Sequence, residues 1–298
     1  MTATSEAGVL AIDIGGTKIA LGIVVDGAVI ERVQVPTPRS GRGVDIVAAI
    51  AEQAAHLPVT KSAGIATTGI VDDGHLTALN AGTLPIEDRF PLVEAVRHEL
   101  QRPVTAINDA QAAAWAEYRS GAGRGSERMV FVTVSTGIGG GLVLDGRLQI
   151  GRHGLAGHIG HMVGDPTGPA CGCGRIGCIE RIASGTAIGQ RASLELGRAM
   201  SAPEVFAAAA AGDDRCNFII DHAARALARI IGDLTASLDL DRVVVGGGVG
   251  MADGFLDRLR TASERQPEIY RRPLVAAALK ADAGLIGVAE LVSGGIFH

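Results

Sequence analysis

Residues 9–27 read VLAIDIGGTKIALGIVVDG, and residues 129–146 read MVFVTVSTGIGGGLVLDG. Each stretch is an apolar run, a loop of glycine and hydroxyl residues, a second apolar run and an Asp-Gly dipeptide. Asp-Gly between apolar runs is a strong signal of a β-hairpin. Backbone N–H groups in two such glycine loops can hold the phosphates of one nucleotide. The repeat therefore predicts a two-domain phosphotransferase in which each domain supplies one loop.

The composition is that of a globular protein of about two domains. Hydrophobic residues make up 47% of the 298 residues and charged residues 20%, which is ample for a core. The net charge is −5 without a basic stripe, so no nucleic-acid partner is expected. No apolar run approaches about 18 residues, so no membrane span is expected. Residues 1–8 do not read as a signal peptide, and we expect a cytoplasmic location.

The order of predicted elements is similar in the two halves. Each half begins with three strands and continues with helices and strands in alternation, which is typical of an α/β fold. The loose stretch 120–126, SGAGRGS, is the best candidate for a connection between domains. We therefore expect a small N-terminal domain over 1–120 and a larger C-terminal domain over 121–283. The last helix, about 284–298, is expected to pack back on the first domain.

Hydrophobic periodicity predicts the other main elements. A short apolar strand is expected over 63–70, and another over 103–107. Helices are expected over 44–57, 91–100, 110–119, 184–197, 203–211 and 214–238.

The motif DIGGTK at 13–18 follows the first strand. A carboxylate at Asp13 can bind Mg²⁺ directly or through water. Gly15 and Gly16 allow the backbone to approach phosphate oxygens, Thr17 offers a hydroxyl and Lys18 a positive charge. The alternative is a hairpin turn with incidental polar residues, but a turn needs only one or two of these six.

Two further glycine loops follow strands: STGIGGG at 135–141 and the glycines of VVVGGGVG at 243–250. Either loop alone is a weak signal. The similarity of the first to DIGGTK strengthens it, and the second can pass beneath a nucleotide base and ribose. The candidate nucleotide contacts are Thr136, Gly137, Gly139, Gly247 and Gly248.

Asn108 and Asp109, in the sequence INDA, stand where a strand meets a helix. Asp109 can be the general base that accepts a hydroxyl proton during phosphoryl transfer, and Asn108 can orient the same substrate. Asn and Asp are also favoured helix caps. Both interpretations can hold together.

Residues 157–180 read GHIGHMVGDPTGPACGCGRIGCIE. His161, Cys171, Cys173 and Cys178 have the spacing H-x9-C-x-C-x4-C, which suits a tetrahedral Cys₃His site for structural Zn²⁺ in the loop 161–178. Buried free thiols or a redox pair are the alternatives, but cytosolic redox pairs are normally C-x-x-C. Cys216 is expected in the core.

The same loop carries candidate sugar contacts. Glu180 follows the last thiol and can accept hydrogen bonds from two sugar hydroxyls. If one ring nitrogen of His161 binds zinc, the other becomes a fixed donor toward a substrate oxygen. His158 can contact the sugar or can be an ordinary surface histidine.

Taken together, DIGGTK, INDA, STGIGGG, the cysteine loop and VGGG resemble the ROK sugar kinases over essentially the whole chain. The resemblance implies a ribonuclease-H-like fold of the actin and hexokinase ATPase type with a zinc-binding loop. Within the family, the stretches 67–80, 107–117 and 154–162 are most similar to the bacterial kinases of N-acetylmannosamine. Most glucokinases of the family have Glu where this chain has His158, which puts glucose in doubt as the main substrate.

The resemblance implies transfer of phosphate from ATP to the 6-hydroxyl of N-acetyl-D-mannosamine, a step in sialic acid catabolism. It implies ATP and Mg²⁺ as cofactors and a homodimer as the assembly. Asp109 would be the base, and Asn108, His161 and Glu180 would orient the sugar. Asn80 and Gly82 are candidates for its far side.

Other functions stay open. A glucokinase or another ROK hexokinase, using ATP or polyphosphate, would share these motifs. A ROK-type sugar-sensing repressor carries an added N-terminal DNA-binding segment, for which no room is expected before Val9. An actin-like filament protein would not explain the cysteine loop or Asp109.

Overall fold

The structure is a computed structural model that describes residues 8–80 and 82–295. The expectation about a signal peptide therefore falls almost entirely outside the described residues. The end of the helix expected over 284–298 does so as well.

The chain forms two compact units. The first contains the described residues of Met1–Ser120, Gln149–Ala156 and Ala281–His298. The second contains Gly121–Leu148 and Gly157–Lys280. The segment Gln149–Ala156, which the sequence places in the C-terminal domain, packs with the first unit.

A five-stranded mixed sheet is the centre of the first unit. Its strand order is β3-β2-β1-β4-β7, in which β1 pairs antiparallel with β2 and parallel with β4. Asp26 and Gly27 both have positive φ in the turn between β2 and β3, as a type I′ hairpin requires. The strands are β1 (Val9–Ile14), β2 (Lys18–Val25), β3 (Ala28–Pro36), β4 (Ala63–Thr67) and β7 (Val104–Asn108).

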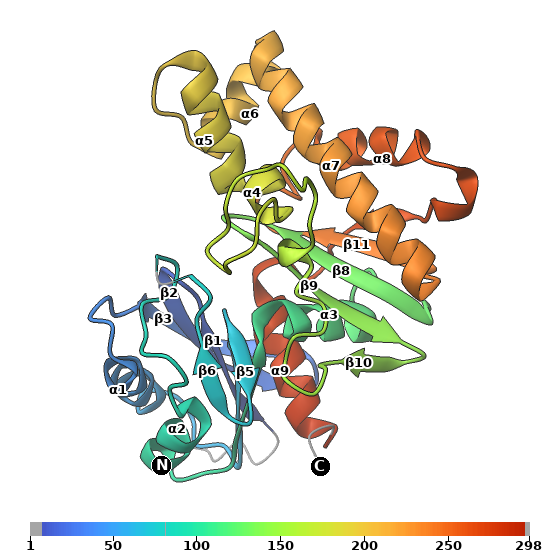
Figure 1. The fold of residues 1–298 in the computed structure, drawn as a ribbon. Helices are drawn as coiled ribbons and strands as arrows, with labels where there is room; N and C mark the ends of the chain where they lie inside the picture. The colour runs from blue at the N-terminus through green and yellow to red at the C-terminus, as the bar shows by residue number, and fades with distance from the viewer. Residues whose placement is uncertain (1–7, 81, 296–298) are drawn as a thin grey trace. The chain divides into compact units, whose positions relative to one another are not determined.

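Four helices and a small hairpin complete the first unit (Figure 1). The last helix, α9, packs on α3 and on strands β1 and β4. Its sequence AGLIGVAELVS presents small residues that allow this close approach. The elements are α1 (Gly43–Ala54), β5 (Ile70–Asp72), β6 (His75–Thr77), α2 (Leu92–Leu100), α3 (Asp109–Ser120) and α9 (Ala283–Ser293).

The sheet of the second unit repeats this topology in the order β10-β9-β8-β11-β12. In both sheets the first three strands of the unit form an antiparallel meander and the next two add in parallel on the other side. The duplicated α/β fold predicted from the sequence is thereby confirmed. The strands are β8 (Arg128–Val134), β9 (Ile138–Leu144), β10 (Arg147–Gln149), β11 (Arg242–Gly246) and β12 (Leu274–Ala276).

The long helix α7 organises the core of the second unit, where it packs with α4, α5, α6 and α8 (Figure 1). Cys216 is buried on it, as expected. No helix within residues 8–80 and 82–295 is long and apolar enough to cross a membrane. The elements are η1 (Ile159–His161), α4 (Glu180–Ala183), α5 (Gly185–Leu196), α6 (Ala202–Ala210), α7 (Asp214–Leu238), α8 (Phe255–Glu264), η2 (Glu268–Tyr270) and η3 (Lys280–Asp282).

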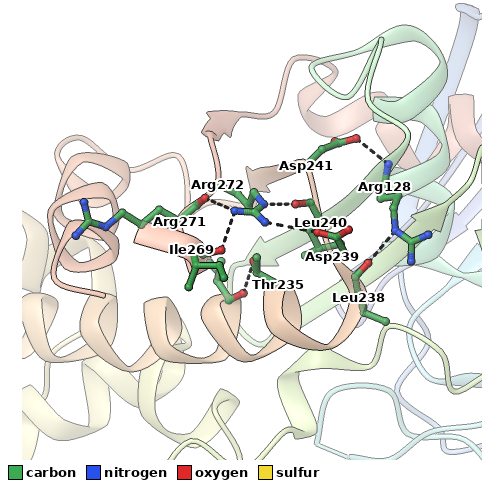
Figure 2. A network of polar contacts seen from close by, with 10 residues as sticks. Arg128, Thr235, Leu238, Asp239, Leu240, Asp241, Ile269, Arg271 and Arg272 are labelled. Carbon is green, nitrogen blue, oxygen red and sulfur yellow. Dashed lines mark hydrogen bonds and ion pairs between the residues drawn. The ribbon is translucent and has the colours of Figure 1, made fainter. Parts of the chain in front are cut away.

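Two arginines hold the chain where α7 ends (Figure 2). Arg272 donates to the carbonyl of Leu240, and the Nε of Arg128 donates to that of Leu238 at 2.8 Å. Asp241 accepts the N–H of Arg128 at 3.0 Å. Carbonyls at a helix end lack partners within the helix, so these bonds fix α7 relative to the start of β8.

The structure differs from the sequence prediction in its short elements. The strand expected over 63–70 ends at Thr67, because Gly69 has a φ of 105° and breaks the extended conformation. Residues 72–74 contain a third Asp-Gly turn, between β5 and β6, which the sequence analysis did not identify. Helix α8 and strand β12 were likewise not predicted.

Candidate active site

Two partly buried carboxylates lie on adjoining parts of the first unit. Asp13 is near the end of β1 and pairs in register with Ala66 of β4. Asp109 is the first residue of α3, directly after β7. Because β1, β4 and β7 run parallel, their carboxyl ends share one edge of the sheet, which is where ligands bind in open α/β sheets.

Burial is the main reason that the pKa values of Asp13 and Asp109 are raised. It raises the pKa of Asp109, and hydrogen bonds to the carboxylate, the first from the N–H of Ala110, oppose it. The pKa of Asp13 rises to about 7, first through burial and second through the charge of Asp109, against the opposing charges of Lys18 and Arg32. Such a pair is ready to bind a divalent cation or to exchange a proton.

Gly284 is a site residue that the sequence analysis missed. A Cβ atom at this position of α9 would lie 3.3 Å from Oδ2 of Asp13. A glycine early in the helix pattern at 284–294 was a visible signal, but only the packing of α9 against β1 reveals its neighbour. A larger residue at position 284 would crowd the Asp13 carboxylate, and glycine avoids this contact.

We predict that Asp13→Asn stabilises the chain at alkaline pH. The pKa of this carboxyl is 3.8 ordinarily and about 7 when folded. Between pH 4 and 7 the folded chain thus binds more protons than the unfolded chain, so its free energy of unfolding falls as pH rises. The amide carries no such cost. Without Mg²⁺, the variant should melt higher than wild type at pH 8, and this difference should shrink steadily as the pH falls toward the ordinary pKa of 3.8.

Thermal melts between pH 5 and 9 test this prediction. Asp45 is the matched control, because its pKa is lowered to about 2 by hydrogen bonds from Arg42 and Ser40, so Asp45→Asn should give no gain at pH 8. Identical pH dependence of melting in wild type and Asp13→Asn would contradict the raised pKa of Asp13.

Asn108 caps the helix that carries Asp109. Its Oδ1 accepts the N–H groups of Ala110 at 2.9 Å and Gln111 at 3.2 Å, and its Nδ2 donates to the carbonyl of Gly69 at 3.0 Å. The capping interpretation is therefore confirmed. These bonds fix the first turn of α3 and, with it, Asp109; contact of Asn108 with substrate stays a prediction.

The loop Gly15–Thr17 joins β1 to β2, and Lys18 begins β2. Thr17 and Lys18 are exposed. On the other predicted loop of this unit, Oδ1 of Asn80 accepts the N–H of Gly82 at 2.9 Å. Asn80 therefore shapes this loop in addition to any contact with a ligand.

In the second unit, Glu180 connects the cysteine loop with the glycine loop at 135–139. Its Oε2 accepts the N–H of Ile138 at 3.0 Å. The start of α5 holds the same loop, because Gly185 donates to the carbonyl of Ser135 at 2.7 Å and the Thr186 hydroxyl to that of Thr136 at 2.9 Å. One carboxylate oxygen of Glu180 thus orders the loop that carries Thr136, Gly137 and Gly139.

A cavity of about 910 Å³ opens beside this loop. Its size is that of a small-molecule or cofactor site, and its walls are mainly apolar with a few polar groups. Two predicted nucleotide contacts, Thr136 and Gly248, line it, and Gly247 precedes the latter. The other lining residues are Ser135, Gly185, Thr186, Gly189, Gln190, Ser193, Leu194, Met200, Ser201, Ala202, Pro203, Phe206, Val249 and Ala252.

Most of these lining residues were missed by the sequence analysis. They come from α5, α6 and the loop after β11, and no single stretch carries a motif. One signal was available: Ser184 precedes Gly185-Thr186, and its Oγ accepts the N–H of Ala187 at 3.1 Å. A capped helix start is a potential anion site, because its first N–H groups lack partners within the helix.

The predicted zinc ligands lie together. The ligand atoms of His161, Cys171, Cys173 and Cys178 are all within 4.8 Å of one another. Sγ of Cys173 is 3.6 Å from Sγ of Cys178, and Sγ of Cys171 is 3.7 Å from Nδ1 of His161. A tetrahedral Zn²⁺ with ordinary bond lengths would separate two sulfurs by about 3.8 Å and a sulfur from a nitrogen by about 3.6 Å. The four residues fit the ion.

Ionisation of the Cys178 thiol carries a cost that such a cation relieves. The pKa of Cys178 is raised to about 12, mainly by burial. Hydrogen bonds with Cys173 and Cys171, and the charges of these two residues, contribute to the rise. A divalent cation favours the thiolate instead. The fold therefore disfavours the Cys178 thiolate unless a cation is bound.

His158 immediately precedes η1, and His161 is its last residue. The Nδ1 of His161 faces the thiol of Cys171, which leaves Nε2 as its outward nitrogen. His158 is partly buried, and its ring centroid is 6.4 Å from that of His161. His158 is thus a neighbour of the predicted ligand set.

Comparisons with known proteins give the family. Residues 9–294 match the ROK family. The chain is 46% identical over 289 residues to an N-acetylmannosamine kinase of Escherichia coli O1:K1, covering 96% of this chain and 99% of that protein.

Two solved structures share the fold. The ROK hexokinase from Thermus thermophilus matches with a TM-score of 0.86 and 36% identity, covering 97% of this chain and 99% of that one. A ROK family glucokinase from Streptomyces griseus, in complex with glucose and AMPPNP, matches with a TM-score of 0.81 and 34% identity, covering 96% and 99%. The predicted hexokinase-type fold is confirmed, and the chain belongs to the ROK family.

Proposed function

We propose that this protein phosphorylates N-acetyl-D-mannosamine at its 6-hydroxyl with ATP, giving N-acetyl-D-mannosamine 6-phosphate. The observation that carries the proposal is the 46% identity to an N-acetylmannosamine kinase over nearly the whole of both chains. The partly buried carboxylates of Asp13 and Asp109, the nucleotide-sized cavity and the cysteine loop support the kinase chemistry. We further propose a role in sialic acid catabolism, a cytoplasmic location and a homodimer, all three on the family resemblance.

Asp109 would accept the proton of the 6-hydroxyl as that oxygen attacks the γ-phosphorus of ATP. Its raised pKa brings a carboxylate closer to the basicity that proton transfer needs near neutral pH. Asn108 holds α3 so that this carboxylate stays in place. Phosphoryl transfer depends mainly on positioning and charge stabilisation, so a fixed base is a large part of what the first unit supplies.

Asp13 would hold Mg²⁺, directly or through water, and the Mg²⁺ would neutralise phosphate charge. The pKa of about 7 supports this assignment, because a nearby cation favours the ionised form of a carboxylate whose ionisation the fold otherwise disfavours. The backbone of Gly15–Thr17, with Lys18, would contact the phosphates in the first unit, and Thr136, Gly137 and Gly139 in the second.

The cavity of the second unit would hold the adenosine of ATP. Its apolar residues, such as Phe206 and Val249, suit a base, and Thr186 and Gln190 offer polar contacts. Gly247 and Gly248 would pass beneath the base and ribose. Glu180, His161 and His158 would bind sugar hydroxyls, with Asn80 and Gly82 at the far side of the sugar. His161, Cys171, Cys173 and Cys178 would hold a structural Zn²⁺ that fixes this loop.

A coupled ADP-release assay with N-acetylmannosamine, N-acetylglucosamine, glucose and mannose tests the proposal. The kcat/KM for N-acetylmannosamine should exceed the others by at least about tenfold. Replacing ATP with polyphosphate in the same assay tests the donor. Comparable activity on glucose would contradict the substrate and leave a ROK hexokinase, and no ADP release with any sugar would contradict the kinase.

We predict that His158→Glu shifts selectivity toward glucose. A carboxylate accepts hydrogen bonds from sugar hydroxyls, whereas a neutral imidazole also donates, so the environment of the 2- and 3-substituents changes. The ratio of kcat/KM for N-acetylmannosamine to that for glucose should fall by about tenfold or more. His98→Glu, at an exposed position of α2, is the control and should leave the ratio unchanged. An unchanged ratio in His158→Glu would remove this residue from the sugar site.

A further inference from the structure

The residues Thr37, Pro38 and Arg39, here called the clamp, follow β3 and bind the glycine loop of DIGGTK. Thr37 is 4% exposed. Its hydroxyl donates to the carbonyl of Gly15 at 2.7 Å, and its N–H donates to that of Thr17 at 3.1 Å. Nη1 of Arg39 donates to the carbonyl of Gly16 at 3.0 Å. Three consecutive carbonyls of the loop are thus bound by one short segment.

This anchoring fixes the direction of the loop's N–H groups. In a trans peptide the C=O of one residue and the N–H of the next lie in one plane and point in opposite directions. No cis peptide occurs among residues 8–80 and 82–295. With the carbonyls of Gly15, Gly16 and Thr17 directed at the clamp, the next N–H groups point away from it. Across the described chain, the N–H groups of Gly16 and Thr17 donate to no protein acceptor, as a row of donors awaiting an anion requires.

Arg39 also binds the loop that carries Asn80 and Gly82. It donates to the carbonyl of Gly82 at 3.0 Å and to that of Thr83 at 3.1 Å. The two loops are in close contact, because a Cβ on Gly16 would lie 2.6 Å from the carbonyl oxygen of Thr83. One guanidinium therefore bridges the glycine loop and the 80–83 loop.

The guanidinium of Arg39 donates to backbone carbonyls and not to a carboxylate. Among the described residues no carboxylate lies within ion-pair distance of it, whereas the nearby Arg42 is paired with Asp45. Three carbonyl bonds to a rigid fork fix its geometry in a way that a lysine ammonium cannot reproduce.

We propose that Thr37 and Arg39 are positioning residues for phosphoryl transfer. Thr37 orients the N–H groups of the glycine loop toward the nucleotide phosphates. Arg39 does the same and also couples that loop to the 80–83 loop, so that the sites for phosphate and sugar are ordered together. This inference rests on the proposed kinase function, in which the glycine loop contacts phosphate and the 80–83 loop contacts sugar.

The two residues predict different kinetic patterns. Thr37→Val removes one hydroxyl donor to the glycine loop alone, so the KM for ATP should rise about tenfold while the KM for the sugar stays within about twofold. Arg39→Ala removes bonds to both loops, so both KM values should rise by about tenfold or more and kcat should fall. Thr37→Ser should restore the wild-type KM for ATP, and Arg39→Lys should lie between wild type and Arg39→Ala.

Matched controls come from the same unit. Thr60→Val removes another buried hydroxyl, one that donates to the carbonyl of Ser62 at 2.9 Å. Arg42→Ala removes an exposed arginine three residues from Arg39. Both should leave the two KM values within about twofold of wild type, and calorimetric titration of the sugar without nucleotide adds a binding readout.

Steady-state kinetics on the full chain, with both substrates varied, decides between the outcomes. ATP-dependent turnover by wild type tests the proposed function. If wild type shows no turnover, the kinase proposal is wrong, and the roles of Thr37 and Arg39 are judged only in an active enzyme. Given an active wild type, a rise in the ATP KM alone for Thr37→Val and in both KM values for Arg39→Ala supports the inference. Unchanged KM values in Arg39→Ala would overturn it, and so would equal rises for both substrates in Thr37→Val without rescue by Thr37→Ser.

Discussion

Asp109→Asn should lower kcat by about 10³-fold, which is the usual scale of a lost general base, and leave sugar affinity within about threefold of wild type. The amide cannot accept the hydroxyl proton. Its Oδ1 can still accept the N–H of Ala110, as Oδ1 of Asp109 does at 2.7 Å, so the start of α3 is preserved. Steady-state kinetics and calorimetric titration of the sugar measure the two quantities.

The loss cannot be attributed to unfolding. Burial raises the pKa of Asp109, which means that the fold disfavours its ionised form, and a neutral amide removes that cost. The variant should therefore melt no lower than wild type at pH 8. Asp45→Asn, a change at a partly exposed carboxylate of the same unit, should keep full turnover. Turnover by Asp109→Asn within tenfold of wild type would show that another group is the base.

Replacing one of the proposed zinc ligands should lower both the stability of the chain and its activity on the sugar. Each purified chain should contain about one Zn²⁺, and Cys178→Ser should abolish it. Because η1 precedes and α4 follows the ligand loop, loss of the ion should disorder His158, His161 and Glu180. We expect the melting temperature to fall by about 10 °C and kcat/KM for the sugar to fall by about 10²-fold.

Metal analysis, melting curves and sugar kinetics measure these effects, and Cys216→Ala provides the control. Cys216 is buried on α7 and lies outside the cluster of four ligands, so this variant should retain zinc and the wild-type sugar KM. Retention of both zinc and sugar KM in Cys178→Ser would contradict the assigned ligand set. Active wild-type protein without zinc would do the same.

Local signals in the sequence predicted the parts of the fold that depend on neighbouring residues. Asp26-Gly27 and Asp145-Gly146 adopt the positive φ values that the hairpin prediction requires. The cysteine spacing placed four ligand atoms together because glycine turns bring close sequence neighbours into contact. The short hairpin of β5 and β6 was missed because strands of three residues carry almost no periodicity.

The parts that could not be predicted depend on contacts between distant segments. Gly284 reaches Asp13 across about 270 residues of sequence, through packing of α9 on β1. The cavity lining likewise gathers residues from α5, α6 and the loop after β11. Pro36 and Pro38 predicted only the end of a strand. The hydrogen bonds that Thr37 and Arg39 make to the glycine loop and to the 80–83 loop join segments far apart in the sequence, and no local pattern predicts them.

The structure of the product tests the central claim most directly. After incubation of the protein with ATP, Mg²⁺ and N-acetylmannosamine, phosphorus–proton correlation NMR identifies the esterified oxygen. The account predicts a phosphorus that couples to the two protons on C6, in an amount equal to the ADP released. Coupling to the proton on C1, or ADP release without a sugar phosphate, would contradict it.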